Sequence, residues 1–129
     1  MTATRDISAF IPQRPPFVFI DTIVEVSATV ARTRYTVTEA NPLVTDGILP
    51  LSGLMENAAQ TCAARGGNTI GYIGAVKQME VSRLPKVGET LITEATVAQE
   101  VLNISLMEVI TRIGDEQIAT TTLKIATIQ

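Results

Sequence analysis

The 129-residue chain contains no histidine, no tryptophan and a single cysteine, Cys62. The absence of histidine removes the side chain that most often exchanges protons near neutral pH and is the commonest metal ligand. One cysteine forms no internal disulfide and, without histidine to share the coordination, holds no zinc. Cys62 is therefore expected to be a small core residue. Any catalysis must use carboxylates, hydroxyls or backbone groups, and we expect neither a metal nor another cofactor.

Basic residues are also few, with ten lysines and arginines against thirteen acidic residues and a net charge of −3. Without a basic tail, and with few aromatic residues, the chain favours neither nucleic acid nor an anionic membrane surface. The start MTATRDISAF lacks the features of a signal peptide, and no apolar stretch is long enough to cross a bilayer. We therefore expect a cytoplasmic protein in which residues 1–129 form one domain.

The remaining pattern is one of strands. After a short helical turn at residues 6–9, β-branched and aromatic residues fill residues 17–26, and a turn near residues 27–29 leads to a second strand ending at residue 38. Later strands are predicted at residues 69–84, 89–101, 103–113 and 117–128. The connections between these later strands are short, which predicts an antiparallel meander.

Between the second and third strands the sequence predicts one helix, at residues 50–65. Pro50 suits its first turn, Arg65 places a cation at its end, and Gly66 with Gly67 can form a left-handed cap. Apolar residues cover most of its circumference, which indicates a buried helix. Two strands, a buried helix and four strands predict an α+β hotdog fold, a curved antiparallel sheet wrapped around one long central helix.

The predicted helix carries a carboxylate, Glu56, among these apolar residues. Ser52, Glu56 and Gln60 follow one another at intervals of four residues and share a narrow stripe of the helix. A buried carboxylate is costly unless it has partners, and the Ser52 hydroxyl and Gln60 amide are candidates. Glu56 is therefore either an acid–base residue or a structural group at solvent, at a dimer seam or beside an arginine.

Three segments carry a family resemblance. The segment IPQRPPFVFIDTIVEV leads into the first strand, LPLSGLMENAAQ starts the helix with an acid-x-x-x-Gln pattern, and GYIGAVKQMEVSRLPKVGETL ends in a Pro-x-x-Gly turn. Together they resemble the bacterial β-hydroxyacyl-acyl-carrier-protein dehydratases of fatty-acid synthesis, in the same order and over nearly the whole chain. The chain is still more similar to a divergent, histidine-lacking branch of these hotdog proteins, associated with aryl-polyene and flexirubin-type pigment clusters.

The sequence departs from this family at its histidines. Gln13 stands where the family's first-strand motif usually has histidine. The family's catalytic histidine lies in a His-Phe-Pro-Gly loop before the helix and works with the helix carboxylate of the other subunit. Here that loop reads NPLVTDGILP, and Asn41, Pro42 and Leu43 lie nearest to the missing histidine. The resemblance implies that Glu56 occupies the helix-acid position.

Three hypotheses accommodate the missing histidine. In the first, Glu56 completes the site of a histidine-bearing hotdog paralogue that processes 3-hydroxyacyl or enoyl thioesters on acyl carrier protein or coenzyme A, in fatty-acid or polyene biosynthesis. In the second, the chain is a non-catalytic subunit that docks the carrier or binds the acyl chain. In the third, ranked below both, Glu56 alone acts as the base or nucleophile of an acyl thioesterase.

Other residues are candidates for binding the substrate or its carrier. The backbone N–H groups of Leu51 and Ser52, at the helix N-terminus, could hold a thioester oxygen, and Gln60 could contact the substrate beside Glu56. Asp46 is a possible substitute acid, although its place before Gly47 indicates a turn. A phosphopantetheine arm on an acidic carrier favours surface cations near the tunnel mouth, and the candidates are Arg14, Lys77, Arg83 and Lys86.

The isolated sheet would leave a long strand edge exposed. We therefore expect a dimer, formed by extending the sheet across a two-fold axis at or near residues 71–84. The sequence does not distinguish a homodimer from a heterodimer with a histidine-bearing paralogue.

Overall fold

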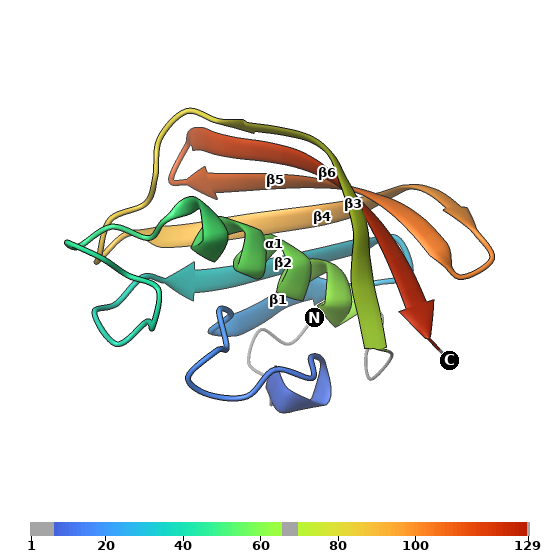
Figure 1. Cartoon of the computed structure of the whole chain (residues 1–129), viewed down its shortest axis with the longest axis horizontal. Coiled ribbons are helices and arrows are strands. Elements are labelled where there is room, and N and C mark those ends of the chain that lie inside the picture. The colour runs from blue at the N-terminus through green and yellow to red at the C-terminus, as the bar shows by residue number, and fades with distance from the viewer. Residues whose placement is uncertain (1–6, 66–69, 129) are drawn as a thin grey trace.

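The structure is a computed structural model that describes residues 7–65 and 70–128. One helix is preceded by two strands and followed by four, in the predicted order (Figure 1). The elements are η1 (Ile7–Ala9), β1 (Thr22–Val26), β2 (Val30–Thr36), α1 (Leu51–Arg65), β3 (Ile70–Val81), β4 (Thr90–Val101), β5 (Ile104–Ile113) and β6 (Glu116–Ile128).

The six strands form one antiparallel sheet in the order β1-β2-β4-β5-β6-β3. The helix α1 lies across one face of this sheet, and the β4–β5 hairpin projects beyond it (Figure 1). This arrangement confirms the predicted α+β hotdog fold. It places β3 at one edge of the sheet and β1 at the other.

The first strand is shorter than predicted, because β1 begins at Thr22 instead of residue 17. The N–H and C=O groups of Phe19, which would join a ladder in a strand, are bound by the side chains of Gln60 and Asn57 of α1. The strand composition of residues 17–21 is therefore overridden by contacts with the helix. The four later strands lie within three residues of their predicted ends.

The start of α1 is defined by Pro50, whose carbonyl accepts hydrogen bonds from the N–H groups of Gly53 and Leu54. Gly53 is required by a close approach, since a Cβ atom there would lie 2.3 Å from Leu49 Cδ1. At the other end the helix closes with Arg65, as predicted. The predicted glycine cap at residues 66 and 67 lies outside the described residues.

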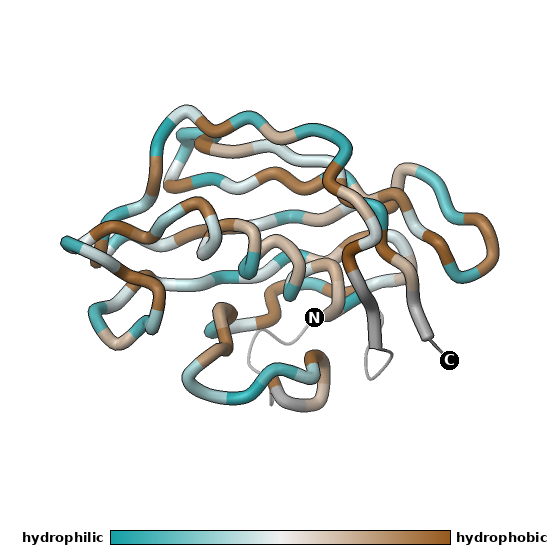
Figure 2. The backbone as a smooth tube through the Cα atoms, viewed as in Figure 1, coloured by the Kyte–Doolittle hydropathy of each residue, from teal (hydrophilic) through white to brown (hydrophobic). Residues whose placement is uncertain are grey.

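Hydrophobic and hydrophilic residues alternate along the strands (Figure 2), and buried residues alternate with less buried ones along β2, β4 and β5. The helix is buried on one side only, although apolar residues cover most of its circumference. Leu51, one of these apolar residues, is 48% exposed. The buried side of α1 consists of Gly53, Leu54, Asn57, Ala58, Gln60, Thr61, Cys62 and Ala64.

Removing a core side chain of α1 is predicted to destabilise the fold strongly. Leu54 is 2% exposed, and Leu54→Ala should lower the free energy of unfolding by about 2–5 kcal/mol because it leaves a cavity. Leu102→Ala removes the same atoms at a turn position that is 94% exposed, and it should change stability by less than about 0.5 kcal/mol. Urea unfolding of both variants measures the difference. Equal effects would contradict the described packing of α1.

Candidate active site

Glu56 lies half-buried on α1, one turn before Gln60. Its Oε2 atom accepts a hydrogen bond of 2.9 Å from Gln60 Nε2. Among the described residues no donor reaches the other oxygen, Oε1, and no hydrogen bond joins Glu56 to Ser52. Of the two partners predicted for Glu56, the structure therefore provides Gln60 and leaves Ser52 exposed.

The orientation of the Gln60 side chain is fixed by the backbone of another segment. Gln60 is fully buried. Its Oε1 atom accepts from the N–H of Phe19 at 2.8 Å, and its Nε2 atom donates to the carbonyl of Phe17 at 2.9 Å. A flipped amide would turn its NH₂ group toward the Phe19 N–H, so only one orientation satisfies both contacts. In that orientation the second Nε2 proton is directed at Glu56.

Sequence reasoning missed a second buried amide, that of Asn57. Its Nδ2 atom donates to the Phe19 carbonyl at 2.8 Å, and its Oδ1 atom accepts from the Thr93 hydroxyl at 2.6 Å. The side chains of Asn57 and Gln60 thus bind both backbone groups of Phe19, and we call these two residues the amide clamp. An asparagine in a helix predicted to be buried was the available signal, since a buried amide needs partners.

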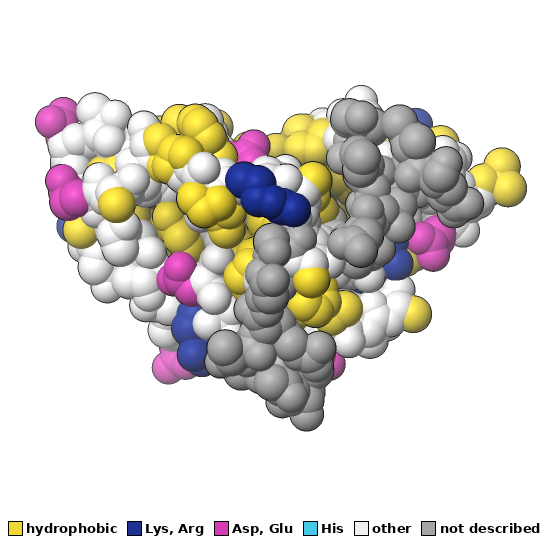
Figure 3. Space-filling model, turned by 90° about the horizontal axis from the view of Figure 1, so that it is seen from below, with side chains coloured by type: hydrophobic (Ala, Val, Ile, Leu, Met, Phe, Trp, Pro, Cys, Tyr) yellow, Lys and Arg dark blue, Asp and Glu magenta, His cyan; other side chains and the backbone are white. Residues whose placement is uncertain are grey.

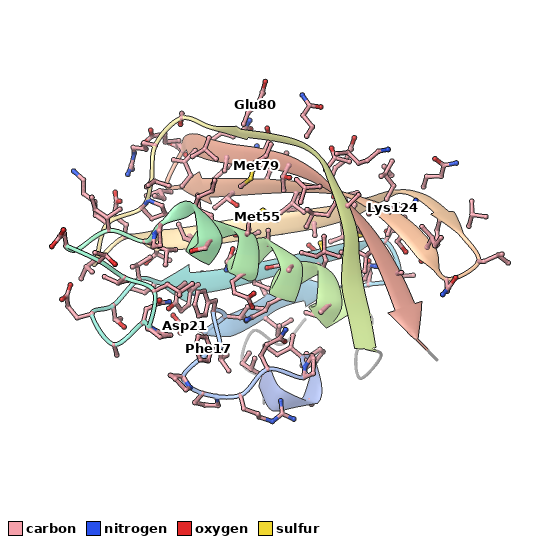
Figure 4. The ribbon with its side chains drawn as sticks, in the orientation of Figure 1. Phe17, Asp21, Met55, Met79, Glu80 and Lys124 are labelled. Carbon is pink, nitrogen blue, oxygen red and sulfur yellow. The ribbon has the colours of Figure 1, made fainter. Side chains whose placement is uncertain are left out.

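Apolar side chains are exposed on the two segments that carry Glu56 and the backbone partners of Gln60. Phe17, whose carbonyl bonds Gln60, is 49% exposed, and Leu51 lies one turn before Met55 and Glu56 on α1. Phe17 and Asp21 belong to the segment that passes beneath the helix in the view of Figure 4. Figure 3 shows hydrophobic side chains in patches on the face seen from below. Exposed apolar surface of this kind is typical of an interface or a binding groove.

The loop that replaces the family's histidine motif is held by its own side chains. The Nδ2 atom of Asn41 donates to the Tyr35 hydroxyl at 2.7 Å, and its Oδ1 atom accepts from the Leu43 N–H at 2.8 Å. Asp46 and Gly47 both have positive φ, at 54° and 74°, as in a two-residue type I′ turn. The turn accounts for Asp46, which is exposed.

The N-terminus of α1 presents the predicted backbone donors. Pro50 O is the first helical acceptor, and it receives the N–H groups of Gly53 and Leu54. The N–H groups of Leu51 and Ser52 precede this first pair, in the position where helix donors lack intrahelical acceptors. Both residues are exposed. They remain candidates for holding a thioester oxygen.

The four predicted carrier-binding cations lie before β1, on β3 and in the connection from β3 to β4. Arg14 donates to the carbonyls of Ile11 and Gln13, at 2.8 and 2.7 Å. Lys77 lies beside Lys124 in a pocket on the outer face of the sheet, where Figure 4 labels Lys124. Lys86 is exposed, and its backbone N–H donates to Glu89.

Arg83 is engaged in ion pairs with two carboxylates. Its guanidinium lies 2.9 Å from Glu89 Oε1 and 3.1 Å from Glu116 Oε1. The hydrogen bonds to Glu89 and then Glu116 raise the pKa of Arg83. The hydrogen bond that Arg83 donates to Glu89 is the largest cause of a lowered pKa of Glu89, and the hydrogen bond from the Lys86 backbone N–H is the second. Together they lower this pKa to about 2. Because these carboxylates neutralise its charge, Arg83 is less available to a phosphate than the sequence suggested.

Cys62 is buried in the apolar core, as predicted. Burial raises the pKa of its thiol to about 12, with a smaller opposing effect of Arg65. The thiolate that a nucleophile would need is therefore disfavoured. In the described part of the chain, no three acidic or cysteine side chains gather as metal ligands, and no helix has the length and apolarity that crossing a membrane requires.

The antiparallel sheet packed on one central helix defines a hotdog protein. A family model described as ApeP dehydratase, of the ApeP-like family, matches residues 5–88. The chain therefore belongs to the ApeP-like dehydratase family, which confirms the resemblance found in its sequence. A comparison with curated proteins found no match.

Solved structures share the fold at low sequence identity. The ApeI:P dehydratase heterocomplex from Xenorhabdus doucetiae has 15% identity and a TM-score of 0.87, over 95% of this chain and 91% of that one. A hypothetical thioesterase protein with coenzyme A from Streptococcus pneumoniae has 12% identity and a TM-score of 0.69, over 82% and 84%. The E. coli PaaI protein has 18% identity and a TM-score of 0.66, over 81% and 80%. At these identities the similarity shows the fold alone.

The ion pairs of Arg83 predict a loss of stability in acid. A carboxyl whose pKa is lowered on folding stabilises the native state above its unfolded pKa, here 4.5, and this contribution is lost as the pH falls toward about 2. Glu89→Gln should therefore lower the melting temperature near neutral pH and have little effect near the acid end of this window. Glu39→Gln, at an exposed loop position, serves as the control. A difference between Glu89→Gln and wild type that is independent of pH would contradict the ion-pair explanation.

Proposed function

We propose that this chain is one subunit of a dehydratase that acts on 3-hydroxyacyl thioesters carried on the phosphopantetheine arm of acyl carrier protein. In this proposal Glu56 is the catalytic residue that the chain contributes, and a histidine of a hotdog paralogue is the second. The observation that carries the proposal is the hydrogen-bonded Glu56–Gln60 pair on the central helix of an ApeP-like dehydratase chain that has no histidine.

The chemistry explains why one carboxyl group calls for a partner. Dehydration removes a proton from the α-carbon, breaks the bond from the β-carbon to the hydroxyl, and protonates that hydroxyl as it leaves as water. One group accepts the α-proton while another donates the proton to the oxygen. Among the described residues, no second titratable side chain bonds Glu56. The second group is therefore expected from another subunit.

The edge position of β3 supports assembly with that subunit. Ile73 and Val76 of β3 are 42% and 47% exposed, so this edge combines unpaired backbone groups with apolar side chains. An edge of this kind is suited to antiparallel pairing with the corresponding strand of a second hotdog subunit. The description of the Xenorhabdus doucetiae structure as a heterocomplex supports the choice of a paralogue over a second copy.

A non-catalytic subunit is the second candidate, favoured by the absence of histidine. In that case the exposed apolar side chains of α1 and of the segment that carries Phe17 would bind the acyl chain or the partner, and Lys77 and Lys86 would contact the acidic carrier. The carboxylate of Glu56 would then contribute no proton transfer. The two candidates differ in the effect of replacing Glu56 without changing its size.

Glu56→Gln is predicted to abolish turnover and preserve folding. A glutamine oxygen can still accept the Gln60 hydrogen bond, but the amide neither gives nor takes a proton, so we expect a rate at least about 100-fold lower. The measurement is dehydration of a 3-hydroxyacyl carrier thioester by the complex with a histidine-bearing hotdog paralogue. Circular dichroism and the melting temperature monitor the fold.

The control for this experiment is Glu108→Gln, which makes the same change at an exposed position of β5. It should leave the rate of the complex unchanged. If Glu56→Gln has the same rate as wild type in a complex that turns over, the catalytic role of Glu56 is wrong and the non-catalytic candidate gains support.

Val76→Lys is predicted to weaken assembly at the edge strand. A lysine there would place a charge in the proposed apolar seam, which should raise the dissociation constant of the complex by about tenfold or more. Val101→Lys, the same change at an exposed position of the β4–β5 hairpin, should have no effect. Analytical ultracentrifugation measures both. Unchanged assembly of Val76→Lys would place the interface away from this part of β3.

A further inference from the structure

The apolar core under α1 has two parts. One cluster includes Leu54 of α1, Tyr35 of β2 and Leu91 of β4. The other includes Ala58 of α1 and Ala95 of β4. Between these members, one residue of α1 and one of β4 are polar and fully buried, namely Asn57 and Thr93. A polar layer therefore crosses the core between helix and sheet, and it consists of Asn57, Thr61, Thr33 and Thr93.

The polar layer is fully connected by hydrogen bonds. The Thr93 hydroxyl donates to Asn57 Oδ1 at 2.6 Å, and the Thr61 hydroxyl donates to the Asn57 carbonyl at 2.8 Å. The hydroxyls of Thr33 and Thr61 lie 2.8 Å apart. Because the Thr61 proton is already used, Thr33 is the donor in that pair. Thr33 and Thr93 are register partners on β2 and β4, so the layer joins α1 to two neighbouring strands.

This connectivity restricts how α1 can sit on the sheet. Apolar contacts are non-directional and permit small rotations of a helix, whereas buried hydrogen bonds are lost when donor and acceptor separate. A rotation or shift of α1 would leave the amide of Asn57 and the Thr93 hydroxyl buried without partners. Glu56 is adjacent to Asn57 on α1. The helix orientation that satisfies the hydrogen bonds of Asn57 therefore also fixes the direction in which the Glu56 side chain points.

We infer that Asn57 is a positioning residue for Glu56, in addition to its place in the core. Its amide holds the Phe19 carbonyl at 2.8 Å, while the same peptide segment holds the amide of Gln60 through the Phe19 N–H. Gln60 then donates to Glu56 at 2.9 Å. The inference rests on the proposed function of Glu56, and it adds the residue that keeps Glu56 aimed during the reaction.

The test compares Asn57→Asp with Thr33→Val. Asn57→Asp keeps the size and the acceptor for Thr93 but loses the donor to Phe19. Thr33→Val removes a hydroxyl of the same polar layer that has no contact with Phe19. Thr93→Val is a milder second variant, because it leaves Asn57 unchanged and removes only the hydroxyl that donates to Asn57 Oδ1. All three are measured as the full chain and in the complex with the paralogue.

Two readouts separate positioning from stability. Hydrogen exchange of the Phe19 amide and the NMR shifts of the Gln60 side-chain NH₂ report the clamp in the chain alone. The kcat and KM of the complex report catalysis. We expect Asn57→Asp to speed exchange of the Phe19 amide, shift the Gln60 signals and lower kcat by about 10- to 100-fold with KM unchanged. Thr93→Val should change the same quantities in the same direction, by less.

Thr33→Val should lower the melting temperature and change the Gln60 signals and kcat by less than Asn57→Asp or Thr93→Val does, because Thr33 reaches Asn57 only through Thr61. Equal effects of Asn57→Asp and Thr33→Val on kcat and on the Gln60 signals would overturn the inference, because they would reduce Asn57 to a structural residue. If Asn57→Asp does not fold, Thr93→Val is compared with Thr33→Val in its place, and equal effects on kcat and on the Gln60 signals would again overturn the inference. A wild-type complex without turnover would contradict the proposed function, whereas unaltered Phe19 exchange and Gln60 signals in the folded variants would contradict the positioning role by themselves.

Discussion

The binding of the Phe19 backbone by the amide clamp, Asn57 and Gln60, is the interaction on which the site depends. Each such hydrogen bond contributes about 0.5–1.5 kcal/mol net, but leaving a buried partner unsatisfied costs about 1–3 kcal/mol. Breaking one of these hydrogen bonds therefore costs more free energy than the small net contribution of the bond suggests. The clamp keeps the residues before Thr22 out of the first strand, fixes the Gln60 amide and, through it, directs a hydrogen bond at Glu56.

The sequence was sufficient for the fold and insufficient for the details of the site. Strands and turns along β3 to β6, and a helix bounded by Pro50 and Arg65, follow from local composition, which is why their order and approximate ends were predictable. Residues 17–21 have the composition of a strand, and it is the contacts of Phe19 with Asn57 and Gln60, 38 and 41 residues away, that take this segment out of the sheet. Likewise, Glu56–Gln60 was predictable from helical spacing, whereas the partners of Asn57 and the ion pairs of Arg83 are tertiary contacts that no spacing reveals.

In the proposed function, an ApeP-like dehydratase chain without histidine supplies one half of an acid–base pair. Its helix presents a half-buried carboxylate held by Gln60, apolar side chains are exposed on α1 and on the segment that carries Phe17, and an unpaired strand edge is available at β3. These three features are what a subunit needs when a second subunit supplies the other reactive group. The polar layer in the core serves the same site, because its directional hydrogen bonds fix the orientation of α1, the helix that carries Glu56.

In the proposed function, activity belongs to the pair of subunits and to neither protein alone. The decisive measurement is the rate of dehydration of a 3-hydroxyacyl carrier thioester by this chain, by a histidine-bearing hotdog paralogue expressed with it, and by their purified complex. We expect turnover by the complex to exceed the summed rates of the separate proteins by at least about 100-fold. A complex no faster than the paralogue alone would contradict it.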